Sequence, residues 1–218
     1  MTSNKEEYLR VIYEMGGETE PVSNKVIAEE LGVSPSSVTE MLTKLKRLGL
    51  ITTQPYKGCK LTSAGLDVCM VVIRNHRLWE VFLVQQLGYS WREAHEEAHL
   101  LEHASTPRLM ERLDQFLGHP ASCPHGFLIP QQNKMGTQGM LESLSDMRKG
   151  SKGILRRITE DVELMDYLQR IGLVLNQEIQ VVEVSDYEGP ITILQEGVPI
   201  NISFKAAHEV FVEIQNEK

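Results

Sequence analysis

The residues best suited to chemistry in this sequence lie close together at positions 94–103, which read AHEEAHLLEH. Ser90 and Glu93 form a capping box, so we expect a helix to begin just after Ser90. At 100° per residue, four potential ligands then fall within about a quarter of the helix circumference. These ligands are His95, His99, Glu102 and His103. Three imidazoles and a carboxylate on one face favour a borderline divalent cation over an ordinary solvated helix face.

The same residues contain the pattern H-E-x-x-H, which in zinc proteases supplies two metal ligands and a general base. Here the pattern runs from His95 through Glu96 to His99. The longer pattern of some zinc proteases, with a glycine and a third histidine, is absent. Glu111 is an unsupported candidate for a further carboxylate ligand. A zinc-dependent hydrolase with Glu96 as its base is therefore the alternative function. The motifs in the rest of the chain distinguish this enzyme from a metal sensor.

The size and composition of the chain are those of an ordinary soluble globular protein, with 41% hydrophobic and 24% charged residues. Its 218 residues can form one large domain or two to three small ones. No apolar run approaches the length of a membrane span, and the first residues do not resemble a signal peptide. The cysteines Cys59, Cys69 and Cys123 are odd in number and widely spaced, which argues against a disulfide framework. We therefore expect a cytoplasmic protein without a membrane segment.

The net charge of −8 argues at first against a nucleic-acid partner, but the charge is unevenly distributed. Residues 33–60 carry five cationic side chains against a single carboxylate, that of Glu40. The cations are Lys44, Lys46, Arg47, Lys57 and Lys60. Because the attraction of phosphates is local, a small basic face on an acidic chain is compatible with conditional DNA binding.

Residues 1–62 have the pattern of a winged helix-turn-helix domain. Apolar residues at helical spacing predict a first helix, and Ser23 and Gly32 are the expected caps of a second, short helix. A third helix should begin after Ser34 and end at Gly49. Two helices joined by a tight turn, of which the second is longer, are typical of a helix-turn-helix. A plain helical hairpin with a solvated face is the alternative.

The third helix is the expected recognition helix. Small polar side chains at its N-terminus suit base edges, and the cations that follow suit phosphates. Residues 51–61 then form two short β-prone pieces around a turn, which is the pattern of a wing. The residues expected to contact duplex DNA are Ser34, Ser36, Ser37, Thr39, Glu40, Lys44 and Lys57.

Residues 63–130 are predicted to form a helical connector for metal binding and dimerisation. A long helix should cover about residues 62–87, with His76 and Glu80 at the i, i+4 spacing that lets two side chains share one ion. A short turn then makes this helix and the histidine-rich helix antiparallel neighbours. A further helix from Pro107 carries apolar residues that could form a two-fold interface, as palindromic operators require.

The rest of the chain reads as a linker followed by a small domain, which gives an α+β fold class overall. Residues 131–149 contain proline and glycine without periodicity, which favours a linker. Before them, Cys123 and His125 lie two positions apart and could contribute to a second metal site. Residues 150–218 are predicted to form a small β-barrel of five strands with one helix at about 161–171. The expected strands are 154–158, 178–184, 191–194, 200–204 and 210–214.

In their order and their residues, these motifs resemble the diphtheria toxin repressor family of metal-dependent transcriptional regulators. The likeness is greatest to the three-domain, manganese-responsive branch of that family, and it covers essentially the whole chain. The residues that carry it are EYL at 7–9, SPSSVTEM at 34–41, HRLWE at 76–80, HEEAHLLEH at 95–103 and CPHG at 123–126. The last domain resembles the FeoA-type barrel.

The resemblance implies a homodimeric repressor that binds double-stranded operator DNA when loaded with a divalent metal and that controls metal-uptake genes. A primary ion would be held by Glu7, His99, Glu102 and His103. A second ion would be held by His76, Glu80, His95, Cys123, His125 and Glu160. Mn²⁺ is the expected ion, and without it we expect Glu7 and Glu102 to repel each other. A metal-buffering protein without a DNA role is a third function, but it leaves the winged helix unexplained.

Three positions depart from the manganese branch. Glu7 stands where that branch commonly has Asp. His99 stands where manganese regulators commonly have Glu and iron regulators Cys, and the additional imidazole leaves Fe²⁺ and Zn²⁺ open. Arg10 occupies the position of a second acid in the two-metal manganese regulators, so we expect no closely spaced binuclear site.

Overall fold

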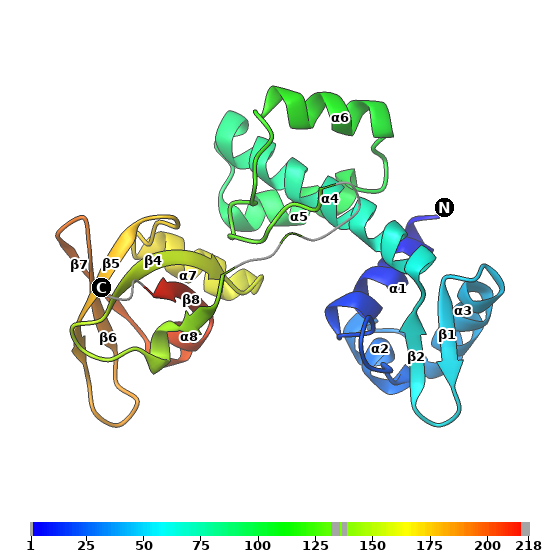
Figure 1. The fold of residues 1–218 in the computed structure, drawn as a ribbon, viewed down its shortest axis with the longest axis horizontal. Helices are drawn as coiled ribbons and strands as arrows, with labels where there is room; N and C mark the ends of the chain where they lie inside the picture. Colours follow the sequence, from blue (N-terminus) through cyan, green and yellow to red (C-terminus); the bar gives the residue numbers. More distant parts are fainter. Residues whose placement is uncertain (1, 132–135, 137–138, 215–218) are drawn as a thin grey trace. The chain divides into compact units, whose positions relative to one another are not determined.

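The computed structural model describes residues 2–131, 136 and 139–214 and has the expected α+β fold (Figure 1). The described residues form two compact units. The first unit contains residues 2–76, 99–110 and 130–131, and the second contains residues 77–98, 111–129, 136 and 139–214. None of the helices in these ranges is long and apolar enough to span a membrane.

The N-terminal part of the first unit is the predicted winged helix. Its elements are α1 (Ser3–Glu14), α2 (Asn24–Leu31), α3 (Pro35–Arg47), β1 (Ile51–Gln54) and β2 (Gly58–Leu61). Ser23 caps α2 by accepting a hydrogen bond from the amide of Val26, and Gly32 ends α2 in the left-handed conformation. Ser34 caps α3 by accepting from the amide of Ser37. The predicted caps therefore fix both ends of the turn between α2 and α3.

The wing is the antiparallel hairpin of β1 and β2, which stands beside α3 (Figure 1). Gly58 has a φ of 121°, and a Cβ atom there would lie 1.9 Å from the carbonyl oxygen of Val22. Only glycine allows the wing to approach the segment before α2 this closely. Val22 and Cys59 exchange two backbone hydrogen bonds at this point. The base of the wing is therefore held against the rest of the domain.

One hydrophobic core joins the winged helix to the first half of α4 (Ser63–Leu87). Leu9 of α1 and Leu45 of α3 are fully buried in this core. Cys69 of α4 joins them, and its thiol donates to the carbonyl oxygen of Leu9 at 3.2 Å. Burial raises the pKa of Cys69 to about 12, and the thiol packs among the apolar residues of this core. The core thus connects α3 to a helix that carries candidate ligands further along.

The connector contains three helices, as predicted, but the second ends earlier than expected. They are α4, α5 (Trp91–Leu101) and α6 (Pro107–Phe116). The predicted capping box is present, because the Ser90 amide donates to the Glu93 carboxylate at 2.9 Å and the Glu93 amide donates to the Ser90 hydroxyl at 3.2 Å. Since α5 ends at Leu101, Glu102 and His103 lie in the turn that follows. The prediction that four ligands share one helical face is therefore wrong for Glu102 and His103.

The C-terminal part of the second unit is a six-stranded antiparallel sheet with two short helices (Figure 1). The strands are β3 (Leu141–Ser143), β4 (Lys152–Ile158), β5 (Glu178–Val184), β6 (Ile191–Gln195), β7 (Val198–Ile202) and β8 (Val210–Ile214). They lie in the order β3-β8-β4-β5-β6-β7, so the described sheet is open, with β3 and β7 at its ends. The helices are α7 (Val162–Arg170), capped by Asp161, and α8 (Phe204–His208).

Two predictions for this part need correction. The strand expected at residues 200–204 is β7, which ends at Ile202, because Ser203 caps α8 through the amide of Ala206. The linker expected at residues 131–149 contains β3 and the 3-10 turn η1 (Leu144–Asp146), and Leu144 is fully buried in the core of the sheet. A three-residue strand is too short to show an alternating pattern in the sequence.

Trp91 joins the helical part of the second unit to the sheet. It is the first residue of α5, yet it belongs to the hydrophobic core of the sheet. Its amide donates to the side-chain oxygen of Gln169 on α7 at 2.8 Å. The neighbouring Arg92 pairs with Asp166 on the same helix at 3.0 Å. The start of α5 and the sheet therefore share one core.

Candidate metal centre and DNA-binding surface

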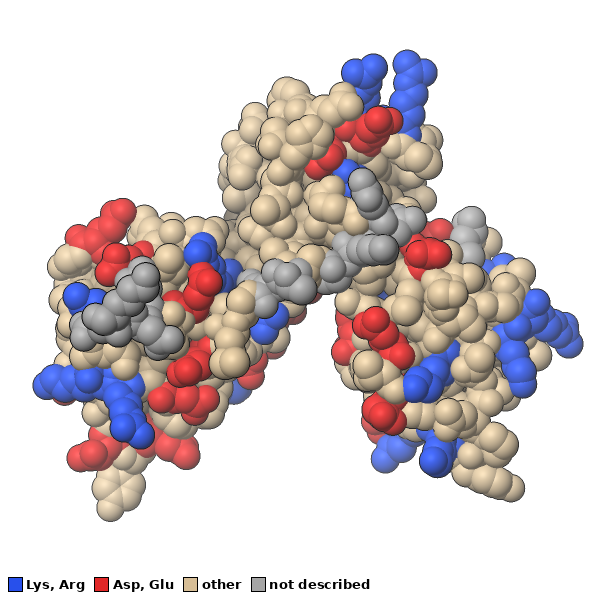
Figure 2. Space-filling view, in the orientation of Figure 1, with Lys and Arg blue, Asp and Glu red and all other residues tan. Residues whose placement is uncertain are grey.

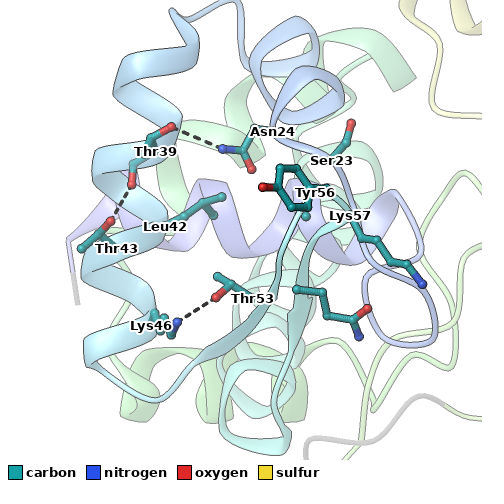
Figure 3. Close-up of a pocket in the computed structure, with 11 residues that line it drawn as sticks. Ser23, Asn24, Thr39, Leu42, Thr43, Lys46, Thr53, Tyr56 and Lys57 are labelled. Carbon is teal, nitrogen blue, oxygen red and sulfur yellow. Dashed lines mark hydrogen bonds between the residues drawn. The ribbon is translucent and has the colours of Figure 1, made fainter.

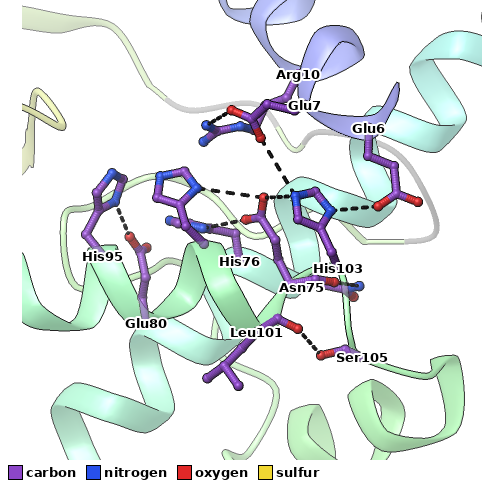
Figure 4. Close-up of polar contacts among 12 residues, drawn as sticks. Glu6, Glu7, Arg10, Asn75, His76, Glu80, His95, Leu101, His103 and Ser105 are labelled. Carbon is purple, nitrogen blue, oxygen red and sulfur yellow. Dashed lines mark hydrogen bonds and ion pairs between the residues drawn. The ribbon is translucent and has the colours of Figure 1, made fainter. Parts of the chain in front are cut away.

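The first candidate metal group lies in the first unit, between α1 and the turn after α5 (Figure 4). One ligand atom from each of Glu7, Glu102 and His103 lies within 4.8 Å of the others. The Nε2 atom of His103 lies 3.1 Å from Glu102 Oε1 and 3.7 Å from Glu7 Oε2. The two carboxylates thus face the same nitrogen of one imidazole, and the repulsion expected between Glu7 and Glu102 without an ion stays a prediction. Three of the four predicted primary ligands come together here.

Glu102 is buried and receives several hydrogen bonds. The Nδ1 atom of His76 lies 2.6 Å from Glu102 Oε2, and the Asn75 side chain donates to the backbone carbonyl of Glu102 at 3.2 Å. Burial alone would raise the pKa of Glu102, but hydrogen bonds from His76 and His99 outweigh it and lower the pKa to about 2. The carboxylate is therefore ionised at neutral pH, in the form that binds a cation.

His76 and His99 lie beside this first group. Their ring centroids are 4.6 Å apart, and His99 Nδ1 lies 3.8 Å from Glu102 Oε1. Burial lowers the pKa of His99 by more than its hydrogen bond to Glu102 raises it, so its ring is neutral at neutral pH and can act as a ligand. The resemblance assigned His76 to the second site, but His76 contacts Glu102 of the first group.

Arg10 occupies the side of the first group next to Glu7. Its guanidinium lies 2.7 Å from Glu7 Oε1 and 3.5 Å from Glu14 Oε1. Burial lowers the pKa of Arg10, but the carboxylates of Glu14 and Glu7 outweigh this effect and raise it. A permanent positive charge beside Glu7 would repel a second cation, and the absence of a closely spaced binuclear site stays a prediction.

Glu6 is a member of the first site that the sequence did not reveal. Its Oε2 atom lies 2.7 Å from Nδ1 of His103, on the opposite side of the ring from the other two carboxylates (Figure 4). No motif marks Glu6, because a carboxylate in the first turn of a helix is ordinary. Only its contact with a residue 97 positions later distinguishes it.

The second candidate metal group lies within the second unit. Ligand atoms of Glu80, Cys123, His125 and Glu160 all lie within 4.8 Å of one another. His125 Nδ1 lies 3.1 Å from Glu80 Oε1 and 3.9 Å from Cys123 Sγ. His95 reaches the same carboxylate from α5, with 2.9 Å between its Nδ1 and Glu80 Oε1. All the predicted second-site residues except His76 are therefore collected here.

The loop that carries Cys123 and His125 is pressed against β4. Gly126 has a φ of 90°, and a Cβ atom there would lie 1.8 Å from the carbonyl oxygen of Arg156. The Ile158 amide donates to the carbonyl oxygen of His125 at 3.0 Å. The loop can approach β4 this closely because position 126 is a glycine.

Two arginines hold the next residue of this loop. The guanidinium carbons of Arg77 and Arg157 lie 5.1 Å and 5.2 Å from the ring centroid of Phe127. Arg77 also donates to the carbonyl oxygen of Leu128 at 2.6 Å. These contacts of cations with an aromatic ring fix the loop between α4 and the sheet.

Both groups offer donors that suit a divalent cation. The first offers two carboxylates and an imidazole, and the second offers two carboxylates, an imidazole and a thiol. Burial, with the charges of Glu80 and Glu160, raises the pKa of Cys123 well above its usual range, so the thiol keeps its proton until a cation displaces it. Glu160 Oε1 is buried and makes no hydrogen bond within the described residues, which is costly for a carboxylate oxygen. The residues present therefore fit a metal ion.

The H-E-x-x-H pattern does not assemble a hydrolase centre. Glu96 has a half-exposed side chain, and its carboxylate accepts from Arg92 at 2.9 Å. The Nδ1 atom of His95 lies 2.9 Å from Glu80 Oε1. A base paired with a surface arginine is not positioned to activate water on a metal held by these histidines.

The predicted DNA-contact residues are exposed on α3 and on the wing. The hydroxyl oxygen of Ser34 lies 2.8 Å from that of Ser36 and 2.9 Å from that of Ser37. The three hydroxyls thus form a connected polar row at the start of the recognition helix. Lys44 pairs with Glu40 one turn earlier, at 2.7 Å. The order of small polar groups followed by a cation matches the prediction.

A groove of about 550 Å³ separates α3 from the wing (Figure 3). It is lined by Thr39, Thr43 and Lys46 of α3 and by Tyr56 and Lys57 of the wing, among others. Lys46 donates to the hydroxyl of Thr53 at 2.8 Å, and Asn24 of α2 donates to the hydroxyl of Thr39 at 3.3 Å. Lys46 and Asn24 were not among the residues predicted to contact DNA. Their hydrogen bonds connect the recognition helix to the wing and to α2.

Charge is separated across the winged helix. In Figure 2, basic side chains project from the outer side of α3, and acidic side chains gather over α1 and α2. Over the C-terminal sheet the two signs are interleaved. A local positive face therefore exists for phosphates in spite of the net charge of −8.

Three family models match the chain in succession. Residues 1–59 match the N-terminal DNA-binding domain of iron dependent repressors. Residues 62–131 match the metal-binding and dimerisation domain of the same repressors, and residues 142–214 match the FeoA domain. These matches follow the order of winged helix, helical connector and C-terminal sheet.

The chain is also similar to named repressors over its whole length. It is 30% identical to the iron-dependent repressor IdeR of Mycobacterium leprae over 226 residues, which cover 98% of each chain. A solved manganese-dependent transcriptional repressor in complex with manganese is 33% identical, with a TM-score of 0.83 over 97% of this chain and 100% of that one. A structure of ScaR with bound Zn²⁺ is 36% identical, with a TM-score of 0.76 over 96% and 98%. The descriptions of these three relatives name iron, manganese and zinc, respectively.

Proposed function

Since the chain belongs to the diphtheria toxin repressor family, which includes the iron-dependent repressors, we propose that it represses metal-uptake genes as a homodimer on operator DNA, with Mn²⁺ as its activating ion. Membership of this family makes the chain a metal-dependent transcriptional repressor and not an enzyme. The proposal adds the identity of the metal, the regulated genes and the symmetry of the complex.

The observation that carries the proposal is the meeting of Glu7 with Glu102 and His103. Glu7 belongs to the first helix of the winged helix, and the other two residues follow the histidine-rich helix α5. When bound, a divalent cation supplies one positive centre for all three ligands. The ligands would then hold α1 against the connector, and through the shared core they would hold the recognition helix. This arrangement links metal occupancy to the position of the DNA-binding residues.

The choice of Mn²⁺ rests on the carboxylates and on the likeness to a solved manganese-dependent repressor. Glu7 and Glu102 supply oxygen ligands, which suit Mn²⁺, and a repressor of high structural similarity carries manganese. His99 acts in the opposite direction, because an imidazole in place of a carboxylate increases affinity for the later transition metals. The homodimer is supported by the matched dimerisation domain and by α6, on which Leu109 and Phe116 are exposed.

The proposed function is tested by measuring operator affinity across a panel of metals. The DNA upstream of the chain's own gene, labelled with a fluorophore, is titrated with the protein in the presence of Mn²⁺, Fe²⁺, Zn²⁺ or a chelator. We expect metal to increase the affinity by about a hundredfold or more and the chelator to abolish the increase. Because a carboxylate favours Mn²⁺ over Zn²⁺, His99→Glu should shift the response toward Mn²⁺. Equal affinity with metal and with chelator would refute metal-dependent repression.

A second prediction concerns the residues that contact DNA. Lys57 is exposed on the wing and should act through a phosphate, so Lys57→Ala should weaken all DNA sequences alike and lower the salt slope by about one unit. The Ser36→Ala, Ser37→Ala double variant should instead change base preference, since it removes hydroxyls from the recognition helix but leaves the capping oxygen of Ser34 in place. Salt titrations and competition with altered operators measure the two effects.

The matched control for Lys57→Ala is Lys205→Ala. Lys205 is an exposed lysine on α8, so the control removes the same charge from the C-terminal part of the chain. It should leave the salt slope unchanged. An unaltered base preference in the double serine variant would count against this placement of the recognition helix.

A further inference from the structure

Glu6 contacts the metal group without being one of its three ligands. Its Oε2 atom lies 2.7 Å from Nδ1 of His103, and the two side chains are only 17% and 16% exposed. Glu6 and Glu7 are consecutive on α1, so their side chains diverge by about 100° around the helix. Both carboxylates nevertheless reach the ring of His103, Glu6 at Nδ1 and Glu7 at Nε2.

The two nitrogens of the His103 ring therefore face different surroundings. Nδ1 faces Glu6, whereas Nε2 faces Glu102 at 3.1 Å and Glu7 at 3.7 Å (Figure 4). An ionised carboxylate can only accept a hydrogen bond, so Nδ1 donates to Glu6. With its hydrogen on Nδ1, the ring can offer the lone pair of Nε2 to an ion that also contacts Glu7 and Glu102.

We propose that Glu6 is a positioning residue that holds His103 in the tautomer with its hydrogen on Nδ1, so that Nε2 is presented to a metal ion together with Glu7 and Glu102. The inference rests on the proposed metal-dependent function and assigns Glu6 a role in it. Histidine ligands of metals commonly donate their other nitrogen to a carboxylate, and loss of that partner costs about 10- to 100-fold in metal affinity.

A direct role of Glu6 as a ligand fits the geometry less well. The atoms that gather within 4.8 Å come from Glu7, Glu102 and His103, and Glu6 stands behind the ring of His103. A carboxylate on the far side of an imidazole can orient the ring, but it cannot reach an ion bound to Nε2 unless the ring turns away. Glu6 therefore acts through His103.

The test uses the full chain with Glu6→Ala and Glu6→Gln. The tautomer of His103 is read from the side-chain nitrogen shifts in ¹⁵N NMR spectra of the metal-free and Zn²⁺-loaded protein, and the affinity for Mn²⁺ is measured by calorimetry. We expect Glu6→Ala to lose about 10- to 100-fold in affinity and to populate the tautomer with the hydrogen on Nε2. Glu6→Gln keeps an acceptor oxygen and should retain the wild-type tautomer and most of the affinity.

Glu20→Gln is the matched control, because it removes the same charge from an exposed position in the winged helix. It separates a general loss of negative charge from the specific contact. Glu6→Ala with the wild-type tautomer and affinity would overturn the assignment of Glu6. A wild-type chain that binds none of the metals would overturn the proposed function instead, and the metal-free nitrogen spectra would still decide the role of Glu6. Circular dichroism establishes that each variant is folded.

Discussion

Glu7→Ala is expected to fold and to keep part of its metal binding, but to lose metal-dependent operator affinity by about two orders of magnitude. Glu7 is the member of the first group that belongs to the winged helix, while Glu102 and His103 follow α5. To raise the active fraction of the molecules from about 1% to about 99%, the metal must stabilise the active state relative to the inactive one by about 5.5 kcal/mol. Ligands on both sides of one ion can supply that energy, because they bind the two states differently. Without Glu7, the winged helix contributes no ligand to this group, because Glu6 contacts only the far side of the His103 ring.

The measurement is the operator titration with and without metal, accompanied by calorimetry of metal binding. Glu14→Ala is the matched control, because Glu14 also lies on α1 and pairs with Arg10 at 3.5 Å but is not part of the group. It tests whether a changed environment of Arg10 is sufficient to weaken the response. If Glu7→Ala still responds to Mn²⁺, Fe²⁺ or Zn²⁺ with normal operator affinity, Glu7 does not bridge the two elements.

Gly126→Ala is expected to disrupt the second metal group although it changes none of the ligands. The new Cβ atom would lie 1.8 Å from the Arg156 carbonyl oxygen, and the residue would have to keep a φ of 90°. Left-handed strain and overpacking together should lower the free energy of unfolding by about 2 to 5 kcal/mol. Because His125 directly precedes Gly126, withdrawal of the loop from β4 would also separate His125 and Cys123 from Glu160. Metal affinity at this group should fall by more than about tenfold.

Gly118→Ala provides the control for this prediction. Gly118 also has a positive φ, 74°, but no heavy atom lies within 4 Å of the position of a Cβ atom. The control should therefore cost only about 1 kcal/mol, the left-handed strain alone. Urea denaturation compares the stabilities, and Co²⁺ absorption reports the bond to the Cys123 thiolate. Identical stability and Co²⁺ spectra in the two variants would show that the crowded loop is not required.

Local features of the sequence predicted most of the fold. The caps Ser23 and Ser34 and the capping box of Ser90 are local, since each depends on residues three positions apart. The pairing of β3 with β8 depends on contacts between residues about 70 positions apart, and the three residues of β3 carry no readable period. Because β3 gives no signal in the sequence, we predicted five strands for this sheet in place of six. For the same reason the predicted linker, residues 131–149, includes the residues of β3.

The candidate ligands could be named from the sequence, but their division between two groups could not. Helical periodicity placed His99, Glu102 and His103 on one face. In the structure α5 ends at Leu101, so the turn that follows sets the positions of Glu102 and His103. His76 and Glu80 lie one turn apart on α4, and yet His76 contacts Glu102 while Glu80 contacts His125. Such a division depends on which tertiary neighbour faces each side chain, and spacing along one helix does not contain that information. Glu6 remained undetected because its partner lies 97 residues away.

The burial of Trp91 in the core of the sheet determines how the second metal group can open. Trp91 lies one helical turn before His95, and α7 is anchored at its start by Asp161, next to Glu160, and near its end by Gln169, which accepts from Trp91. A local fluctuation of the loop can expose Cys123 and His125, but it cannot release Glu160 and His95, which are attached to the core. Amide hydrogens near those two residues should therefore exchange only when the sheet itself unfolds. An ion bound there could therefore be exchanged through opening of the loop alone, while Glu160 and His95 keep their positions for the next ion.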